Sequence, residues 1–429
     1  MIKFQKKVLK NGLRVILAPM ENTEAATFMT LVGVGSRYET KNISGISHFL
    51  EHMFFKGTKS RPKLGQVHQD LDKIGATHNA FTSKETTGFW VKSSAKDFGV
   101  GLDIVSDILL EPLFKKEEIE KERGVILQEI SMYEDEPRRK VWEVLENVLY
   151  GDNPIGWDIA GEKESVNKIR RKNILDYRTK NYLSKNMIVV AAGNIDVEKV
   201  FGEIEKRFNK IGKGKNKPAK KIKIAQKSAR VKVINKDSDQ AHLALAFRAY
   251  NMFDEKRYAL NLLAVMLGGN ASSRLFMEIR EKLGLAYYVF AFGDQCTDCG
   301  YLGMGAGVAH DKVEETLKKM GEISRLLKRR GISKNELKFA KSFLRGQMSL
   351  ALETSDDIAS FCANQELFYN KVLQPEKVLE RIEKISQNDI LKVAKEAFNP
   401  NRMSVAIIGK HEDFAKKEKF YKSLIYKQF

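Results

Sequence analysis

The sequence contains only three cysteines among its 429 residues, too few for a disulfide framework. No apolar run approaches the roughly 20 residues that span a bilayer, and the basic N-terminus lacks the apolar core of a signal peptide. These absences argue against a secreted, disulfide-bridged fold and against a membrane protein. We therefore expect a cytoplasmic protein that makes no contact with a membrane.

The length and composition favour a globular protein of several domains. A chain of 429 residues exceeds what one hydrophobic core usually serves, so two or more domains are expected. Hydrophobic residues make up 43% of the chain and charged residues 30%, a balance that excludes a mainly disordered protein.

The net charge of +19 is concentrated in one segment. Residues 209–230 contain eight lysines, one arginine and no acidic residue, and they supply +9 of that charge. Two glycines and a proline disfavour regular structure there, which is typical of a linker between domains. A contact for nucleic acid or an acidic partner is the alternative, but the segment has no aromatic residue on which a base would stack. We interpret it as a basic linker between domains 1–208 and 231–429, and we expect no nucleic-acid partner.

Two long-range similarities indicate that these domains are copies of each other. The apolar runs Met187–Gly193 and Met403–Gly409 lie 216 residues apart and both have the pattern of a buried strand. The charged segments Lys116–Arg123 and Lys334–Lys341 lie 218 residues apart. Each half mixes such strands with long helical patterns, so we expect two homologous domains.

The strongest local signal is the H-x-x-E-H motif formed by His48, Glu51 and His52. It lies in the segment Ile46–Phe55, which has the pattern of a helix that ends near Gly57. On a helix the two histidines project from one face, where neutral imidazoles can share one Zn²⁺. Glu51 lies on nearly the same face and is placed to act as a general base on a water molecule.

A catalytic zinc usually has three protein ligands, so a third must come from elsewhere in the chain. The helical segment Glu117–Glu134 offers Glu122 and Glu129, which lie two turns apart on one face. In a charge-rich helix both are equally compatible with a solvated surface. The positions that match them in the second half are Ala340 and Gln347, so we expect only the first half to bind metal.

The chain resembles the pitrilysin family of zinc peptidases, the inverzincins, and most closely the branch of the mitochondrial processing peptidase and its short bacterial relatives. The blocks Gly33–Glu39 and Gly45–Thr58 match the signature of that family. The resemblance implies that Glu129 is the third zinc ligand and that Glu122 is a carboxylate that supports the site.

The same resemblance assigns a role to the segment Gly75–Thr82, which matches an edge strand beside the zinc. A substrate peptide adds to this strand through backbone hydrogen bonds, with Asn79 and Ala80 as binding positions. His78 lies in this strand and has the chemistry of a ligand, but the family ligand set is complete without it.

In the second half, the blocks Leu267–Phe276 and Arg280–Tyr288 match the family as well. Relatives use an arginine and a tyrosine seven residues apart to contact substrate, and Arg280 and Tyr287 match that pair. The phenol would donate to the oxyanion of the tetrahedral intermediate, and the guanidinium would hold a peptide carbonyl. Tyr288 is the alternative if the register is shifted by one residue.

The resemblance implies an α+β fold with two homologous domains, each a mainly antiparallel sheet flanked by helices, that face each other like a clamshell around a chamber. It implies a zinc-dependent endopeptidase with one Zn²⁺ per chain that cleaves peptides or unfolded or leader segments in that chamber. We expect a homodimer, with an inactive homologous partner as the alternative. The alternative function is a non-catalytic chaperone-like or partner subunit of the same family.

The remaining candidates for metal chemistry are weak. The Cys296–Cys299 pair is a lone C-x-x-C without two further ligands nearby, so we interpret these residues as ordinary thiols. Four further histidines have no partner at ligand spacing in the sequence: His68, His242, His310 and His411.

Overall fold

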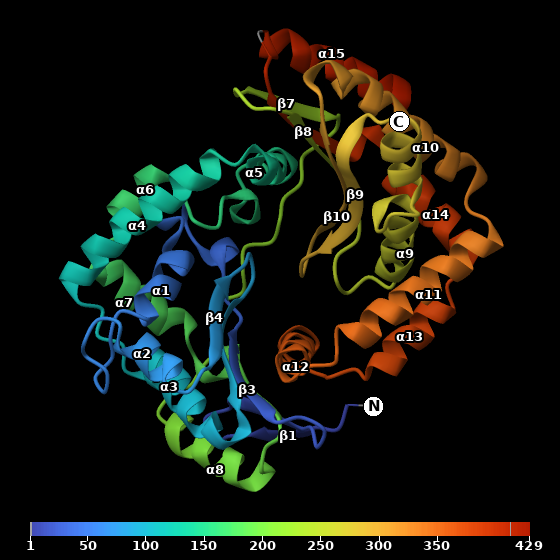
Figure 1. Cartoon of the computed structure of the whole chain (residues 1–429). Coiled ribbons are helices and arrows are strands. Elements are labelled where there is room, and N and C mark those ends of the chain that lie inside the picture. Colours follow the sequence, from blue (N-terminus) through green and yellow to red (C-terminus); the bar gives the residue numbers. More distant parts are fainter. Residues whose placement is uncertain (1, 412) are drawn as a thin grey trace. The chain divides into compact units, whose positions relative to one another are not determined.

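The computed structural model of the chain describes residues 2–411 and 413–429 (Figure 1). The described chain divides into two compact units. Unit 1 consists of the residues up to Ile130 together with Trp157–Lys220 and Met348–Glu376, and unit 2 consists of Ser131–Gly156, Lys221–Gln347 and Lys377–Phe429. None of the helices in the described part of the chain has the length and apolar character needed to cross a membrane.

Unit 1 is built on one sheet with the strand order β1-β2-β6-β3-β5-β4. Neighbouring strands are antiparallel except for the parallel pair β2 and β6. The strands are β1 (Gln5–Val8), β2 (Arg14–Pro19), β3 (Ala25–Val32), β4 (Thr77–Thr82), β5 (Thr87–Ser94) and β6 (Met187–Gly193).

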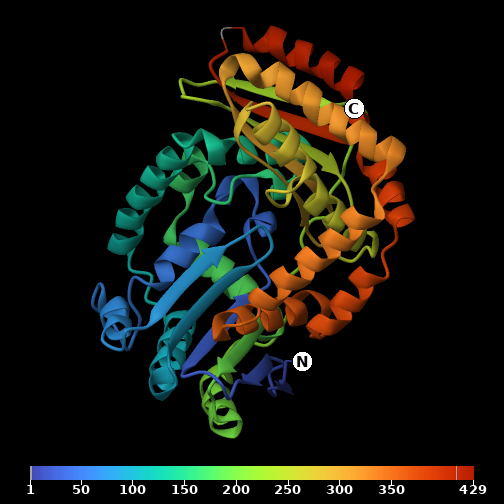
Figure 2. The same ribbon diagram turned by 45° about the vertical axis from the view of Figure 1, so that its right-hand side comes forward.

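Helices cover both faces of this sheet. They are α1 (Ile46–Phe54), α2 (Gln66–Asp72), α3 (Phe98–Leu110), α4 (Lys116–Glu134), α6 (Lys163–Lys168), α7 (Arg171–Asn181), α8 (Val197–Phe208) and α12 (Ser355–Tyr369). Because side chains alternate along a strand, Phe28 of β3 contacts Phe98 and Phe208 on α3 and α8, while Met29 and Leu31 pack toward α12. Figure 2 shows the backbone of α12, in orange, beside the strands of this sheet. This two-sided burial explains why nearly every residue of β3 and β6 is buried.

Unit 2 repeats the arrangement with the strand order β7-β11-β8-β10-β9. Its one parallel pair, β7 with β11, occupies the place of β2 with β6, and the other neighbours are antiparallel. This shared topology supports the duplication, and the two sheet-and-helix units confirm the predicted α+β class. The strands are β7 (Arg230–Asn235), β8 (Ala241–Arg248), β9 (Ala286–Gln295), β10 (Gly300–Val308) and β11 (Met403–Gly409).

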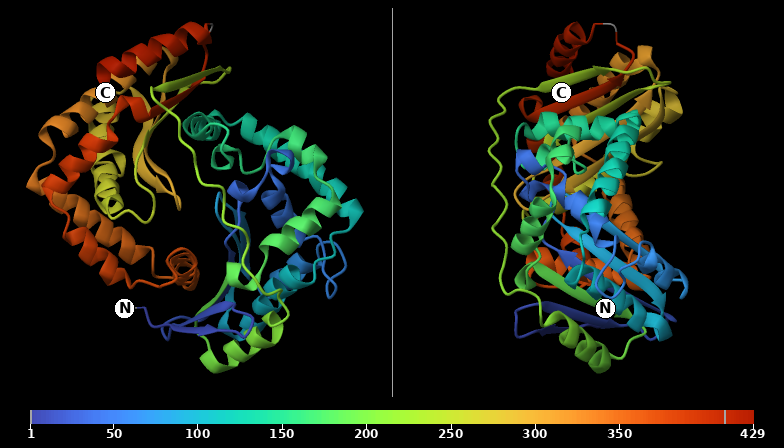
Figure 3. Two further views of the ribbon diagram at one scale, coloured as in Figure 1. Left: turned by 180° about the vertical axis from the view of Figure 1, so that it is seen from behind. Right: turned by 90° about the vertical axis from the view of Figure 1, so that its left-hand side faces the viewer.

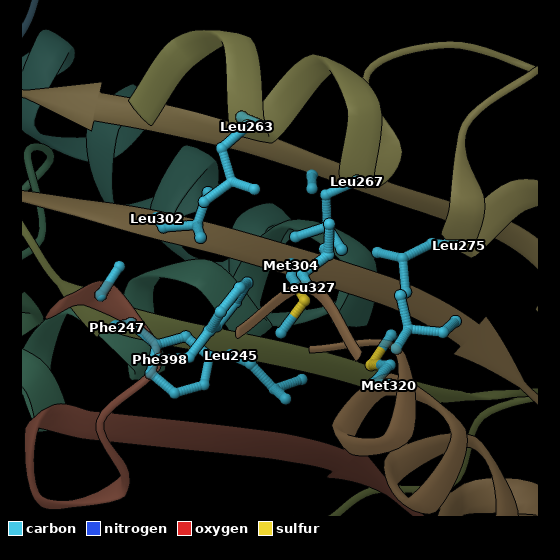
Figure 4. Close-up of a cluster of buried hydrophobic side chains, with 14 of the residues drawn as sticks. Leu245, Phe247, Leu263, Leu267, Leu275, Leu302, Met304, Met320, Leu327 and Phe398 are labelled. Atoms are coloured by element: carbon cyan, nitrogen blue, oxygen red, sulfur yellow. The ribbon is translucent and has the colours of Figure 1, made fainter. Parts of the chain in front are cut away.

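The core of unit 2 lies between its sheet and a helical layer. Figure 4 shows part of it, where Leu263 and Leu267 point toward Leu302 and Met304 of β10, all buried. The helices are α5 (Pro137–Tyr150), α9 (Lys256–Gly268), a π-helical turn (Phe276–Lys282), α10 (Val313–Arg330), α11 (Lys334–Leu350), α13 (Pro375–Glu383), α14 (Gln387–Ala397) and α15 (Phe414–Gln428).

The two units differ from the predicted domains 1–208 and 231–429 by an exchange of helices. α5 precedes the linker but packs on β8 and β11, where Val141, Leu145 and Leu149 are buried. α12 follows the linker but packs on β3 and β6. The apolar stripe of a helix shows in a sequence that it is buried, but not which sheet buries it.

The linker itself has no regular structure. Residues 209–229, all described, contain neither helix nor strand, and Figure 3 shows them as an extended trace. Backbone hydrogen bonds fix this trace: Gly212 and Gly214 accept from the backbone of Ser184 and Lys185 in unit 1. All eight lysine side chains are exposed.

Candidate metal centre

Helix α1 carries both histidines of the H-x-x-E-H motif, and its apolar side anchors it to the sheet. Phe54 is fully buried and meets the ring of Phe89 on β5 edge-on, with ring centroids 5.1 Å apart. His48 and His52 lie on the other side of the helix, one turn apart, with ring centroids 4.5 Å apart. The helix was predicted at these residues, and the structure places it at Ile46–Phe54.

The N-terminus of α1 is held by a buried carboxylate. Gly45 adopts a left-handed conformation (φ 92°), and Glu39 accepts hydrogen bonds from the backbone N–H groups of Gly45 at 2.7 Å and Ser47 at 2.8 Å. Burial raises the pKa of Glu39 to about 8, although these N–H groups oppose the shift. The hydroxyl groups of Ser47 and Tyr177 form a further hydrogen bond of 2.8 Å.

His48, His52 and Glu129 come together as a candidate metal site. The two Nε2 atoms lie 3.2 Å apart, and the Oε2 atom of Glu129 lies 3.6 Å from each. A tetrahedral zinc ion with bonds of 2.0–2.2 Å separates its ligand atoms by about 3.3–3.5 Å. The nitrogen and oxygen donors therefore fit one zinc ion in both type and spacing. All three side chains are partly exposed, which leaves access for a water molecule or a substrate.

Glu122 contacts the nitrogen of His52 that faces away from the candidate metal site. Its Oε1 atom lies 2.8 Å from Nδ1 of His52, and its Oε2 atom lies 2.6 Å from Nζ of Lys56. Burial opposes the charged form of His52. The hydrogen bond and charge of Glu122, together with the charges of Glu51 and Glu129, outweigh burial and raise the pKa of His52. Burial likewise opposes ionisation of Glu122, yet His52 and Lys56 lower its pKa. Glu122 thus orients the imidazole whose other nitrogen faces the site.

Glu51 lies beside the histidines and is held by a residue that the sequence did not single out. The hydroxyl of Thr82 donates to Oε2 of Glu51 at 2.5 Å. Burial and the charge of Glu129 raise the pKa of Glu51, while Thr82 and His52 oppose the shift. Thr82 lies on β4, two residues from Ala80. Its place on the same face of the predicted strand as Ala80 was the one sequence feature that pointed to a role in the site.

The segment predicted as an edge strand forms β4, which pairs with β5 at one end of the sheet. Along β4 Asn79 is exposed and Ala80 partly exposed, and the Ala80 N–H donates to Oδ1 of Asn79 at 2.9 Å. A cleft of about 250 Å³ is lined by both residues and by Glu51 and His52. An extended peptide would find an unpaired strand edge here, beside the candidate metal site.

Arg280 and Tyr287 lie in unit 2, on the π-helical turn and β9. The Tyr287 side chain is 71% exposed, and the Arg280 guanidinium lies 6.0 Å from the centroid of its ring. Tyr288 is engaged inside unit 2, because its hydroxyl lies 2.8 Å from Nδ1 of His242 and Arg138 stacks on its ring. Of the two neighbouring tyrosines, Tyr287 is the one with a phenol available to a ligand.

The two cysteines of the C-x-x-C pair do not form a metal site with further ligands among the described residues. Cys296 and Cys299 flank the turn between β9 and β10 and form no disulfide. Among the described residues, only the His48, His52 and Glu129 group brings three ligands together. A larger cavity of about 810 Å³ lies elsewhere in unit 1, along α3, α7 and α8. Its carboxylates Asp103 and Asp107 pair with arginines, Asp103 with Arg61 and Arg207 and Asp107 with Arg61.

Comparison with known protein families finds two matches along the chain. A family model described as insulinase (peptidase family M16) matches residues 14–163, which include all of the candidate metal site. A model described as peptidase M16 inactive domain matches residues 168–344.

The chain is also similar to individual proteins over nearly its whole length. It is 32% identical to an uncharacterized zinc protease of Streptomyces coelicolor, with 95% of this chain and 90% of that protein covered. It is 34% identical to an uncharacterized zinc protease of Rickettsia felis, with 95% and 98% covered. The crystal structure of a protease from Helicobacter pylori superposes with a TM-score of 0.90 at 27% identity, with 95% and 100% covered.

Proposed function

The chain belongs to peptidase family M16, and on this premise we propose that it is a zinc-dependent endopeptidase that cleaves peptides or unfolded segments. One observation carries the proposal: His48, His52 and Glu129 place three donors at zinc spacing, with Glu51 beside them. The names of the relatives support zinc and proteolysis, and they identify no substrate.

The mechanism that we propose assigns each step to a side chain of unit 1. Zinc held by His48, His52 and Glu129 would lower the pKa of a water molecule and polarise the scissile carbonyl. Glu51 takes a proton from the attacking water and passes it to the leaving amine. Its raised pKa suits that double role, because a base that must also act as an acid works best near the operating pH.

Substrate binding is proposed to use the edge of β4 and the pair Arg280 and Tyr287. Asn79 and Ala80 would offer backbone groups to an extended peptide. Binding of this kind suits unfolded chains because it contacts the peptide backbone instead of particular side chains. The exposed phenol of Tyr287 would donate to the developing oxyanion, and Arg280 would hold a peptide carbonyl. We also propose one zinc per chain and a homodimer.

The proposed activity is tested with an internally quenched peptide, with and without a chelator, beside the Glu51→Gln variant. We expect cleavage that the chelator removes and zinc restores, and none from the variant, although the variant binds zinc as the wild type does. Cleavage by Glu51→Gln would exclude the assigned base. If the wild type binds zinc but cleaves no peptide, the non-catalytic or partner-dependent role in the same family becomes the better account.

A further inference from the structure

Two histidines outside the candidate metal centre lie side by side in unit 1. The Nδ1 atom of His68 on α2 lies 3.1 Å from the Nε2 atom of His78 on β4. The matching distance between the ring nitrogens of His48 and His52 is 3.2 Å. Two imidazoles that share one ion bring their nitrogens to about this separation. The second pair therefore has the geometry of a two-ligand metal site.

Both imidazoles are held in place and open to solvent. The ring of Phe55, directly after α1, stacks on His68 with centroids 5.6 Å apart and an angle of 13°. His78 is fixed by the pairing of β4 with Val91 on β5. His68 is exposed and His78 partly exposed, so an ion reaches both nitrogens without rearrangement of the backbone.

We propose that His68 and His78 form a second, weaker site for Zn²⁺ or another imidazole-binding transition metal such as Ni²⁺, and that metal bound there inhibits the enzyme. The site is weaker because the chain supplies two ligands instead of three. The pair lines the same cleft as Glu51 and His52, and His78 is next to Asn79 on the edge strand. A hydrated ion there would occupy the space that a substrate strand needs.

The binding half of this proposal stands on the histidine geometry alone, and the inhibition half rests on the proposed function. Equilibrium dialysis of the full chain against rising free zinc, followed by metal analysis, separates the two. We expect two zinc ions per chain for the wild type at high free zinc and one for a His68→Gln, His78→Gln double variant. His242→Gln, which removes a histidine of unit 2, is the matched control and should behave as the wild type does.

Peptide cleavage by the same proteins supplies the second readout. Inhibition by excess zinc, measured for each protein relative to its own activity with one equivalent of zinc, should require at least tenfold more metal in the double variant. Equal zinc stoichiometry in the wild type and the double variant would overturn the second site. If the stoichiometry differs but excess zinc inhibits both proteins alike, the inhibitory role is wrong. Absence of any cleavage would count against the proposed function and leave the dialysis result standing.

Discussion

The carboxylate of Glu51 is oriented by the hydroxyl of Thr82, which lies 31 residues further along the chain. Because one oxygen of Glu51 accepts this hydrogen bond, the proposed mechanism has the other oxygen accept the proton of the attacking water. Thr82 also belongs to β4, so the proposed substrate strand and the proposed base are joined by one side chain. We regard Thr82 as a positioning residue that acts through Glu51.

Replacing Thr82 by valine keeps the shape of the side chain and removes the donor. Hydrogen bonds to charged groups contribute about 1.5–3 kcal/mol, so we expect kcat to fall about 10- to 100-fold. Zinc content and KM should change little, and Thr82→Ser should restore most of the activity. Steady-state kinetics on the quenched peptide measure this, and equal losses in the serine and valine variants would count against the hydroxyl.

We expect Glu122 to act on metal affinity instead of on proton transfer. It bonds His52 on the side away from the candidate site, and partners of this kind typically change metal affinity 10- to 100-fold. We expect Glu122→Gln to weaken zinc binding by about that factor in a competition assay with a chromophoric chelator. Glu118→Gln, on the same helix but paired with Lys121, should bind zinc as the wild type does. Unchanged affinity in Glu122→Gln would remove this role.

Glu39 makes the stability of the chain depend on pH. Its pKa is about 8 when folded and near 4.5 in an unfolded chain, so the folded state holds an extra proton between these values. Its contribution is therefore complete below about pH 4.5 and is lost as the pH rises through 8, by about 5 kcal/mol in total. Thermal unfolding from pH 5 to 9 should show this fall in the wild type, and Glu39→Gln should flatten it. Parallel curves for the two proteins would contradict the assignment.

Among individual residues, the sequence predicted those of the H-x-x-E-H motif, but it did not predict several side chains that contact them. His48, Glu51 and His52 follow from helix periodicity, because four residues make about one turn. The partners Glu129 and Glu122 needed the family resemblance, since spacing alone left both open as the third ligand. Thr82, Glu39 and the pairing of His68 with His78 depend on how a helix and a strand meet, which no local pattern encodes.

Among the elements, α12 has the least expected position. It closes the face of the unit 1 sheet formed by β3 and β6, although it comes from the second half of the chain. A buried carboxylate on this helix, Glu366, pairs with Arg14 of β2 at 3.3 Å and with Lys6 of β1 at 2.7 Å. The apolar contacts and this ion pair together fix α12 on the sheet.

Removing the charge of Glu366 tests this attachment. Loss of one partner of a buried ion pair leaves the other charge uncompensated, and we expect Glu366→Gln to cost about 3 kcal/mol of unfolding free energy in unit 1. Thermal unfolding measures the loss as a lower midpoint. Glu21→Gln removes an acid that pairs with Lys3 on the exposed surface and should leave the midpoint unchanged. Equal midpoints for the two variants would show that the ion pair does not hold the helix.

The elements themselves were largely predictable. The strands at Met187–Gly193 and Met403–Gly409 occur at the predicted residues, because a continuous run of buried apolar side chains marks a strand covered on both faces. The helix predicted over Glu117–Glu134 forms α4. The exchange of α5 and α12 was not predictable, since an amphipathic helix records only that one face is buried.

For the whole molecule, the duplication explains why one metal centre is expected from two similar units. α11 is the counterpart of α4, and there the position of Glu122 is a fully buried alanine, Ala340, while that of Glu129 is an exposed glutamine, Gln347. Neither provides a metal ligand, and the family description of residues 168–344 as an inactive domain agrees with this loss. The predicted resemblance to zinc peptidases is confirmed for the family, while the clamshell arrangement and the homodimer stay predictions.

The measurement that tests the account most directly is X-ray absorption spectroscopy of the full chain loaded with one equivalent of zinc. His48, His52 and Glu129 predict two imidazole nitrogens at about 2.0–2.1 Å, carboxylate and water oxygens at similar distances, and no sulfur. Glu129→Gln should change this shell, whereas Gln347→Glu, at the matching position of the second unit, should not. A sulfur shell near 2.3 Å would place the zinc on cysteine and contradict the account.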